Sequence, residues 1–104
     1  MTLQRGDIVI VDFPFSSGAR SKIRPALVVQ NDNNNRRLAN VIVAAITTTT
    51  SRGGEPTQFL VEHSSAMGQQ SGLSHDSVVT CESLATVHSS LVRAKIGSLP
   101  PDVM

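Results

Sequence analysis

Short runs of β-branched residues, separated by polar turn-forming segments, constrain the fold of this chain more than any other feature of its sequence. In the first half such runs occupy residues 8–11 (IVIV), 26–29 (ALVV) and 41–46 (VIVAAI). Val and Ile favour strands, and short runs bounded by Pro, Asn or Ser are typical of strands rather than helices. The sequence therefore predicts a small sheet protein.

Residues that interrupt a sheet mark the ends of these strands. The first strand is predicted to reach Phe13 and to stop at Pro14, which has no backbone N–H to donate. Pro25 is tolerated because it stands at the start of the second strand. Residues 31–35 (NDNNN) predict a turn, since Asn and Asp side chains bond nearby backbone groups. The run at 41–46 is apolar throughout, which predicts a central strand.

The second half continues the pattern with less regular runs. Predicted strands lie at residues 58–62, 77–80 and 84–87. Residues 64–72 are predicted to be a connection in which Gly68 and Gly72 interrupt any helix. Ser89 is expected to cap a turn of helix over Leu91, Val92 and Ile96, and a second helix start is expected at residues 100–102 (PPD).

These elements predict a mainly β fold with minor α content, in which a compact, twisted, mainly antiparallel sheet closes toward a barrel. Residues 1–104 are expected to form a single domain, because one core removes about 65% of the surface of an unfolded chain of this size from water. The chain is 39% hydrophobic and 16% charged, a balance typical of neither a disordered nor a membrane protein.

The sequence also indicates a cytoplasmic location. The longest apolar run, at 41–46, is far shorter than the ~20 residues that span a bilayer, and the N-terminus has no apolar signal region behind Arg5. Cys81 is the only cysteine, which excludes an internal disulfide and a multi-cysteine zinc site.

A net charge of +1 hides an uneven distribution of charge. Residues 20–52 hold six basic groups against one acid, a local balance of +5, whereas the rest of the chain carries −4. Clustered Lys and Arg release counterions from phosphates on binding, so the stretch suggests an anionic partner. A solvated loop face that binds nothing explains the charge equally well.

Four segments in order resemble the MazF/PemK-like toxins, endoribonucleases of bacterial toxin–antitoxin pairs. They are residues 5–13, which include RGDIV and DF, then 24–29 (RPALVV), 41–47 (VIVAAIT) and 76–79 (DSVV). The resemblance implies an SH3-like or CcdB-like barrel and a homodimer with an RNA groove at its interface. It also implies a cognate antitoxin that blocks the groove and, together with the toxin, binds DNA. Family members usually add a helix for which this sequence has no residues after Met104, so we expect a domain without it.

The implied reaction is sequence-specific cleavage of single-stranded RNA without metal, in which the 2′-hydroxyl attacks to leave a 2′,3′-cyclic phosphate and a 5′-hydroxyl. The resemblance makes Arg24 and Thr47 the catalytic residues. A guanidinium matches phosphate oxygens in pairs and stays charged. A threonine hydroxyl orients the phosphate or the 2′-hydroxyl by a hydrogen bond, although three further threonines blur the register. The expected substrate-binding residues are Phe15, Ser17, Arg20, Lys22, Thr48, Thr49, His75, Asp76 and Ser77.

The general base is left open by the sequence. One common family pattern has a glutamate in the loop before Arg24, where this chain has Arg20. His63, His75 and His88 suggest a paired-histidine ribonuclease, yet none stands in a strong motif, and a polar turn explains His75 and Asp76 as well. No His, Asp and Glu spacing resembles a ligand set, so neither a metal nor another cofactor is expected.

Two other functions fit the same fold. A gyrase-binding toxin similar to CcdB would need a C-terminal tryptophan, and this chain has none. A non-catalytic barrel that binds nucleic acid or peptide is the other alternative.

Overall fold

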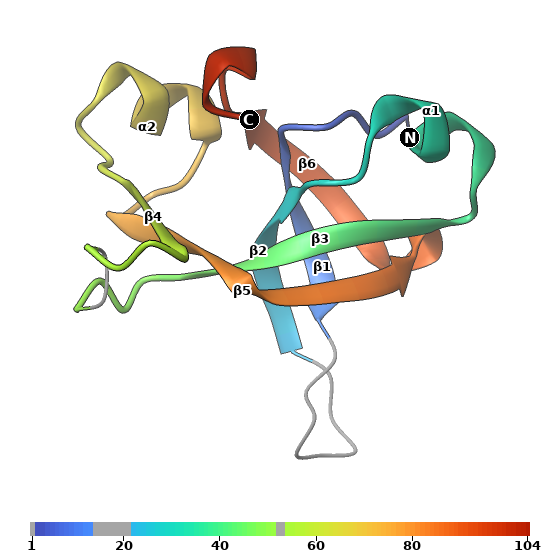
Figure 1. Ribbon diagram of the computed structural model, residues 1–104, viewed down its shortest axis with the longest axis horizontal. Coiled ribbons are helices and arrows are strands. Elements are labelled where there is room, and N and C mark those ends of the chain that lie inside the picture. The colour runs from blue at the N-terminus through green and yellow to red at the C-terminus, as the bar shows by residue number, and fades with distance from the viewer. Residues whose placement is uncertain (1, 14–21, 52–53) are drawn as a thin grey trace.

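The computed structural model describes residues 2–13, 22–51 and 54–104 and confirms a mainly β fold with short helices (Figure 1). None of the described helices has the length and apolar character that crossing a membrane requires. In chain order the elements are β1 (Asp7–Phe13), β2 (Lys22–Val28), α1 (Asp32–Arg37), β3 (Asn40–Thr47), β4 (Gln58–Val61), α2 (Ala66–Ser71), β5 (Ser77–His88), the 3-10 turn η1 (Ser89–Leu91), β6 (Val92–Ser98) and the 3-10 turn η2 (Pro101–Val103).

The described strands form one antiparallel sheet in the order β4-β5-β3-β2-β1-β6. Because β4 and β6 are its two edges, the sheet stays open and does not close into a barrel. In Figure 1, β3 and β5 run across the view while β1 and β2 run steeply past them, so the sheet is strongly twisted. The apolar run at 41–46 lies in β3, between β5 and β2, as its composition predicted.

Apolar side chains are buried on both faces of the sheet, because successive residues of a strand point in opposite directions. The first cluster comprises Leu3, Val9, Val11, Ala26, Val28, Val41, Val43 and Val87. The second cluster comprises Ile8, Leu27, Ala44, Ile46, Val61, Leu73, Val79 and Leu99. The strands are therefore held on both sides, which gives the residues at their ends a rigid support.

The turn predicted at residues 31–35 is wrong, because these residues begin α1. The side chain of Asn31 caps the helix by accepting a hydrogen bond from the Asn34 backbone N–H at 2.8 Å. An acid, Asp32, stands in the first turn, and Arg36 and Arg37 stand in the last, where each charge complements the helix dipole. The side-chain chemistry that suggested a turn is used here as an N-cap.

Residues 64–72, predicted to be a connection, contain α2. Ser65 caps the helix, and Gly72 ends it in the left-handed conformation at φ 74°. Gly68 lies inside the helix because the preceding chain passes very close to it. A Cβ at this position would collide with the carbonyl oxygens of Glu62 and His63.

The strands predicted at 77–80 and 84–87 are one strand, β5, which keeps its pairing with β3 across an irregularity. The register shifts between Ala44 and Ala45, whose partners are Leu84 and Thr80. Residues 81–83 are extra residues of β5 that have no partner in the β3 ladder. The Cys81 backbone N–H donates a hydrogen bond to the Thr57 carbonyl oxygen at 2.8 Å. After β5, the helix predicted from Ser89 to Ile96 is only the turn η1, since the chain continues as β6 and pairs with β1. The helical turn expected at 100–102 is present as η2.

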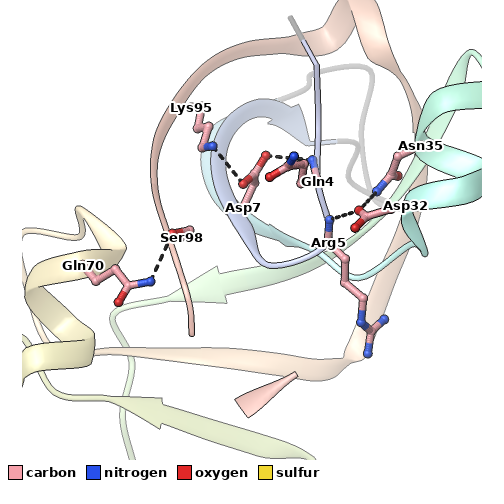
Figure 2. A network of polar contacts seen from close by, with 8 residues as sticks. All are labelled: Gln4, Arg5, Asp7, Asp32, Asn35, Gln70, Lys95 and Ser98. Atoms are coloured by element: carbon pink, nitrogen blue, oxygen red, sulfur yellow. Dashed lines mark hydrogen bonds and ion pairs between the residues drawn. The ribbon is translucent and has the colours of Figure 1, made fainter. Parts of the chain in front are cut away.

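A buried carboxylate fixes the start of β1 (Figure 2). Asp7 is 3% exposed, and its two oxygens contact Lys95 Nζ at 3.1 Å and the Gln4 backbone N–H at 2.8 Å. A buried charge needs such partners, because losing water costs it several kcal/mol. The pair joins β1 to β6 at the edge of the sheet.

A second carboxylate ties the N-terminal segment to α1. One oxygen of Asp32 accepts hydrogen bonds from the Arg5 backbone N–H at 2.6 Å and from Asn35 Nδ2 at 3.2 Å (Figure 2). The Arg5 guanidinium donates to the carbonyl oxygens of Val29 and Met104. The Arg5 backbone hydrogen bond is the largest influence on the Asp32 carboxyl and lowers its pKa, against an opposing effect of desolvation.

Replacing Lys95 by methionine should destabilise the protein by about 2–3 kcal/mol, because the Asp7 carboxylate stays buried without its cation. The matched control is Arg93→Met. Arg93 is 57% exposed and pairs with Asp12, which is 19% exposed, so its loss should cost at most about 1 kcal/mol. Urea unfolding of both variants measures the difference, and equal losses would contradict the special role of the Asp7 pair.

Asp32→Asn should lower the melting temperature at pH 7 and have a smaller effect in acid. A carboxyl whose pKa is depressed by folding stabilises the native state above its unfolded pKa, and that contribution is lost as pH falls through the folded value. The gap between native and variant proteins should therefore begin to narrow below about pH 4. Thermal unfolding at several pH values tests this, and a gap independent of pH would contradict it.

Candidate functional site

Arg24 and Thr47 are brought together by the pairing of β2 with β3. The ladder pairs Val28 with Val43, Leu27 with Ala44 and Ala26 with Ala45. If the same register continued for two more residue pairs, Arg24 would lie opposite Thr47, on one face of the sheet. The ladder ends at Ala26 next to Pro25, which has no backbone N–H to extend it.

The two strands border a hollow at this point. Its volume is about 370 Å³, and it is lined by Arg24, Pro25, Ile46, Thr47, Thr48, Thr49 and Ser77. Among the described residues lining it, the charged side chain is that of Arg24, and the others contribute hydroxyl groups or apolar surface. A cation beside several hydroxyls, with no carboxylate among these lining residues, suits an anion.

Hydrogen bonds order the hydroxyl groups around the hollow. The Thr47 hydroxyl oxygen accepts from the Thr49 backbone N–H at 3.1 Å, which fixes the chain where it leaves β3. This bond uses a lone pair and leaves the hydroxyl proton available to a ligand. Ser77 is 2% exposed, and its hydroxyl donates to the His75 carbonyl at 2.9 Å.

A second hollow adjoins the first through Thr48, which lines both. Its volume is about 460 Å³, and it is lined by Thr48, Thr50, His63, Ser74, His75 and Asp76. The Asp76 carboxylate accepts a hydrogen bond from the His63 backbone N–H at 2.7 Å, so it joins the segments before α2 and after it. Ser74 Oγ lies 3.0 Å from His75 Nδ1.

Most residues predicted from the sequence lie at these two hollows. Arg24, Thr47, Thr48, Thr49 and Ser77 line the first, and His75 and Asp76 line the second. Lys22 begins β2. Three predicted substrate-binding residues, Phe15, Ser17 and Arg20, lie outside the described residues.

His63, Ser74 and Thr50 also line the second hollow but were not predicted as site residues. No local motif marks His63. Its only sequence signal is its residue type, and its position beside His75 depends on the fold of the segment between them.

A third hollow, of about 410 Å³, lies at the other end of β3. It is lined by Thr2, Leu3, Asn35, Arg36, Leu38, Asn40, Val41 and Ser89. Arg36 is its only charged residue among those described, which makes it a useful comparison for Arg24.

Comparison with solved structures gives close structural matches. The Mycobacterium tuberculosis toxin MazF-mt6 is 29% identical, with a TM-score of 0.72 over 92% of this chain and 82% of that chain. An endoribonuclease from a mycobacterial species is 25% identical, with a TM-score of 0.72 over 100% of this chain and 82% of that one. A mycobacterial endoribonuclease in complex with its cognate antitoxin is 23% identical, with a TM-score of 0.71 over 96% and 82% of the two chains, and shows the shared fold.

No curated protein sequence matches this chain. A family model does match it, over residues 4–104, and its description is PemK-like, MazF-like toxin of type II toxin–antitoxin system. The match includes the whole described sheet and the residues that line the first two hollows. The chain therefore belongs to the PemK-like, MazF-like family of toxins of type II toxin–antitoxin systems.

Proposed function

We propose that this protein is an endoribonuclease that cleaves single-stranded RNA without a metal ion and in a sequence-specific manner. The observation that carries the proposal is the hollow at the ends of β2 and β3, where one guanidinium stands among hydroxyl groups. The mycobacterial protein that is 25% identical to this chain is named an endoribonuclease, which supports the same activity here. The 2′-hydroxyl attacks the adjacent phosphorus, and the products are a 2′,3′-cyclic phosphate and a 5′-hydroxyl.

Arg24 stabilises the transition state of this reaction. As the O2′–P bond forms, negative charge grows on the non-bridging oxygens of the phosphate. The planar guanidinium donates two parallel hydrogen bonds to such oxygens and stays charged at any physiological pH. Its half-buried position at the end of β2 limits competition from water, which strengthens each bond.

The hydroxyl groups position the substrate. The Thr47 hydroxyl donates a hydrogen bond to the phosphate or to the attacking oxygen, while its oxygen accepts one from the Thr49 backbone N–H. Thr48 and Thr49 line the hollow beside Thr47, and the Ser77 hydroxyl holds the His75 backbone carbonyl. Phe15, Ser17, Arg20 and Lys22 contact the RNA on either side of the scissile bond, the basic residues at phosphates and Phe15 at a base.

The protein acts with two kinds of protein partner in the cytoplasm. A cognate antitoxin blocks the groove, a proposal supported by membership of a family of toxins from type II toxin–antitoxin systems. A second copy of the chain completes the RNA groove. Apolar side chains such as Ile23 and Leu84, each 56% exposed, are available for contacts of this kind.

Arg24→Ala should reduce cleavage of a mixed-sequence single-stranded RNA in EDTA by about 10²–10³-fold, the usual cost of one donor to developing charge. The control is Arg36→Ala, which removes a cation from the hollow at the other end of β3 and should leave the rate unchanged. Gel analysis of the products should find cyclic phosphate and 5′-hydroxyl ends. Cleavage that survives Arg24→Ala would remove Arg24 from the mechanism, and a native chain that cuts no RNA would disprove the proposed function.

Thr47→Val should slow cleavage by about 3–10-fold, the value of one neutral hydrogen bond of about 0.5–1.5 kcal/mol, and Thr47→Ser should restore it. Thr86→Val is the matched control, since Thr86 pairs with Ile42 near the opposite end of β3. Initial rates at saturating RNA distinguish the three variants. Equal rates for Thr47→Val and the native chain would show that Thr47 only orders the chain after β3 and takes no part in cleavage.

A further inference from the structure

His63 and His75 line one hollow although they come from different segments of the chain. His63 follows β4, and His75 precedes β5. The hollow shares Thr48 with the hollow that holds Arg24, so the two hollows adjoin. Two imidazoles next to a phosphate site can divide the work of a base and an acid.

His63 is held at three points although its side chain is exposed. Its backbone N–H donates to Asp76 at 2.7 Å, and its carbonyl accepts from Gln69 Nε2 at 2.7 Å. Its ring Nδ1 lies 3.0 Å from the Leu73 carbonyl oxygen. The ring is therefore positioned before any substrate arrives, which a catalytic group requires.

The contact with Leu73 also decides which ring nitrogen carries the proton. A carbonyl oxygen only accepts, so Nδ1 must be the donor. In the neutral ring this leaves the lone pair on Nε2. His63 is thus set as a proton acceptor.

His75 has a different contact. Its Nδ1 faces the hydroxyl of Ser74, which can donate or accept and so permits either protonation state. Of the described residues that line this hollow, Asp76 is the one with a carboxylate. A second acid, Glu62, directly precedes His63 in the chain.

We propose that His63 is the general base and His75 the general acid of the RNA cleavage proposed above, on which this inference rests. Nε2 of neutral His63 takes the proton of the 2′-hydroxyl as the O2′–P bond forms. The P–O5′ bond breaks, and the departing 5′-oxygen takes a proton from the His75 imidazolium. The two rings exchange protonation states during the cleavage, and proton exchange with water resets them.

The test is the pH dependence of cleavage at saturating RNA in EDTA. The native chain should give a bell-shaped profile, with an acidic limb from His63 and an alkaline limb from His75. His63→Asn keeps an amide nitrogen near the position of Nδ1 and so keeps the bond to Leu73, but it removes the base. It should lower kcat at least about 100-fold with KM unchanged, and abolish the acidic limb.

His75→Asn should abolish the alkaline limb in the same way. His88→Asn is the matched control, because His88 lies at the far end of β5, where its Nδ1 accepts from the Ser90 backbone N–H. The control should retain the native profile. Binding of an RNA with a 2′-deoxy residue at the cleavage site should be the same for the native chain, His63→Asn and His88→Asn, since no proton is transferred in binding.

The outcomes separate this inference from the function on which it rests. No cleavage by the native chain overturns both. Native cleavage that Arg24→Ala abolishes and His63→Asn leaves intact overturns the histidine assignment alone. A native cleavage rate that does not change between about pH 5 and 9 also overturns the histidine assignment. This measurement needs no variant, so it does not depend on whether a variant folds.

Discussion

The pairing of β2 with β3 is the constraint on which the rest of the structure depends. Both strands are central, and their side chains are buried on alternate faces, so a shift of one residue would exchange the two apolar clusters. The register that satisfies both cores is also the register that sets Arg24 against Thr47. Stability and the composition of the site are consequences of the same alignment.

The two hollows differ in chemistry and in how the chain builds them. The first is made by strand ends, where a cation and hydroxyl groups are presented by the rigid sheet. The second is made by connections on either side of α2, where a carboxylate and an amide bond the His63 backbone and a carbonyl bonds its imidazole. The guanidinium and the imidazoles thus line adjoining hollows that are independently supported.

The sequence predicted the strands well because their signal is local. The β-branched runs predicted β1 to β3, a less regular run predicted β4, and the uninterrupted run at 41–46 predicted the central position of β3. The errors occurred where tertiary contacts decide. Asn31 became a helix cap, and Gly68 was accepted inside α2 because the chain passes close to it. Similarly, β5 continues through residues 81–83 because β3 pairs with it on both sides of the irregularity. Within the site, Arg24 and Thr47 stood out through resemblance, whereas His63 had no local signal.

Gly68 limits the substitutions that this protein can accept in α2. It lies outside both hollows, yet the carbonyl oxygens of Glu62 and His63 occupy the space that a side chain would need. Any larger residue would push that backbone away and carry the His63 ring off the Leu73 carbonyl. Gly68 takes no part in the chemistry, yet it restricts the position of the His63 imidazole. The sequence of α2 is therefore constrained at this residue by a contact with the backbone.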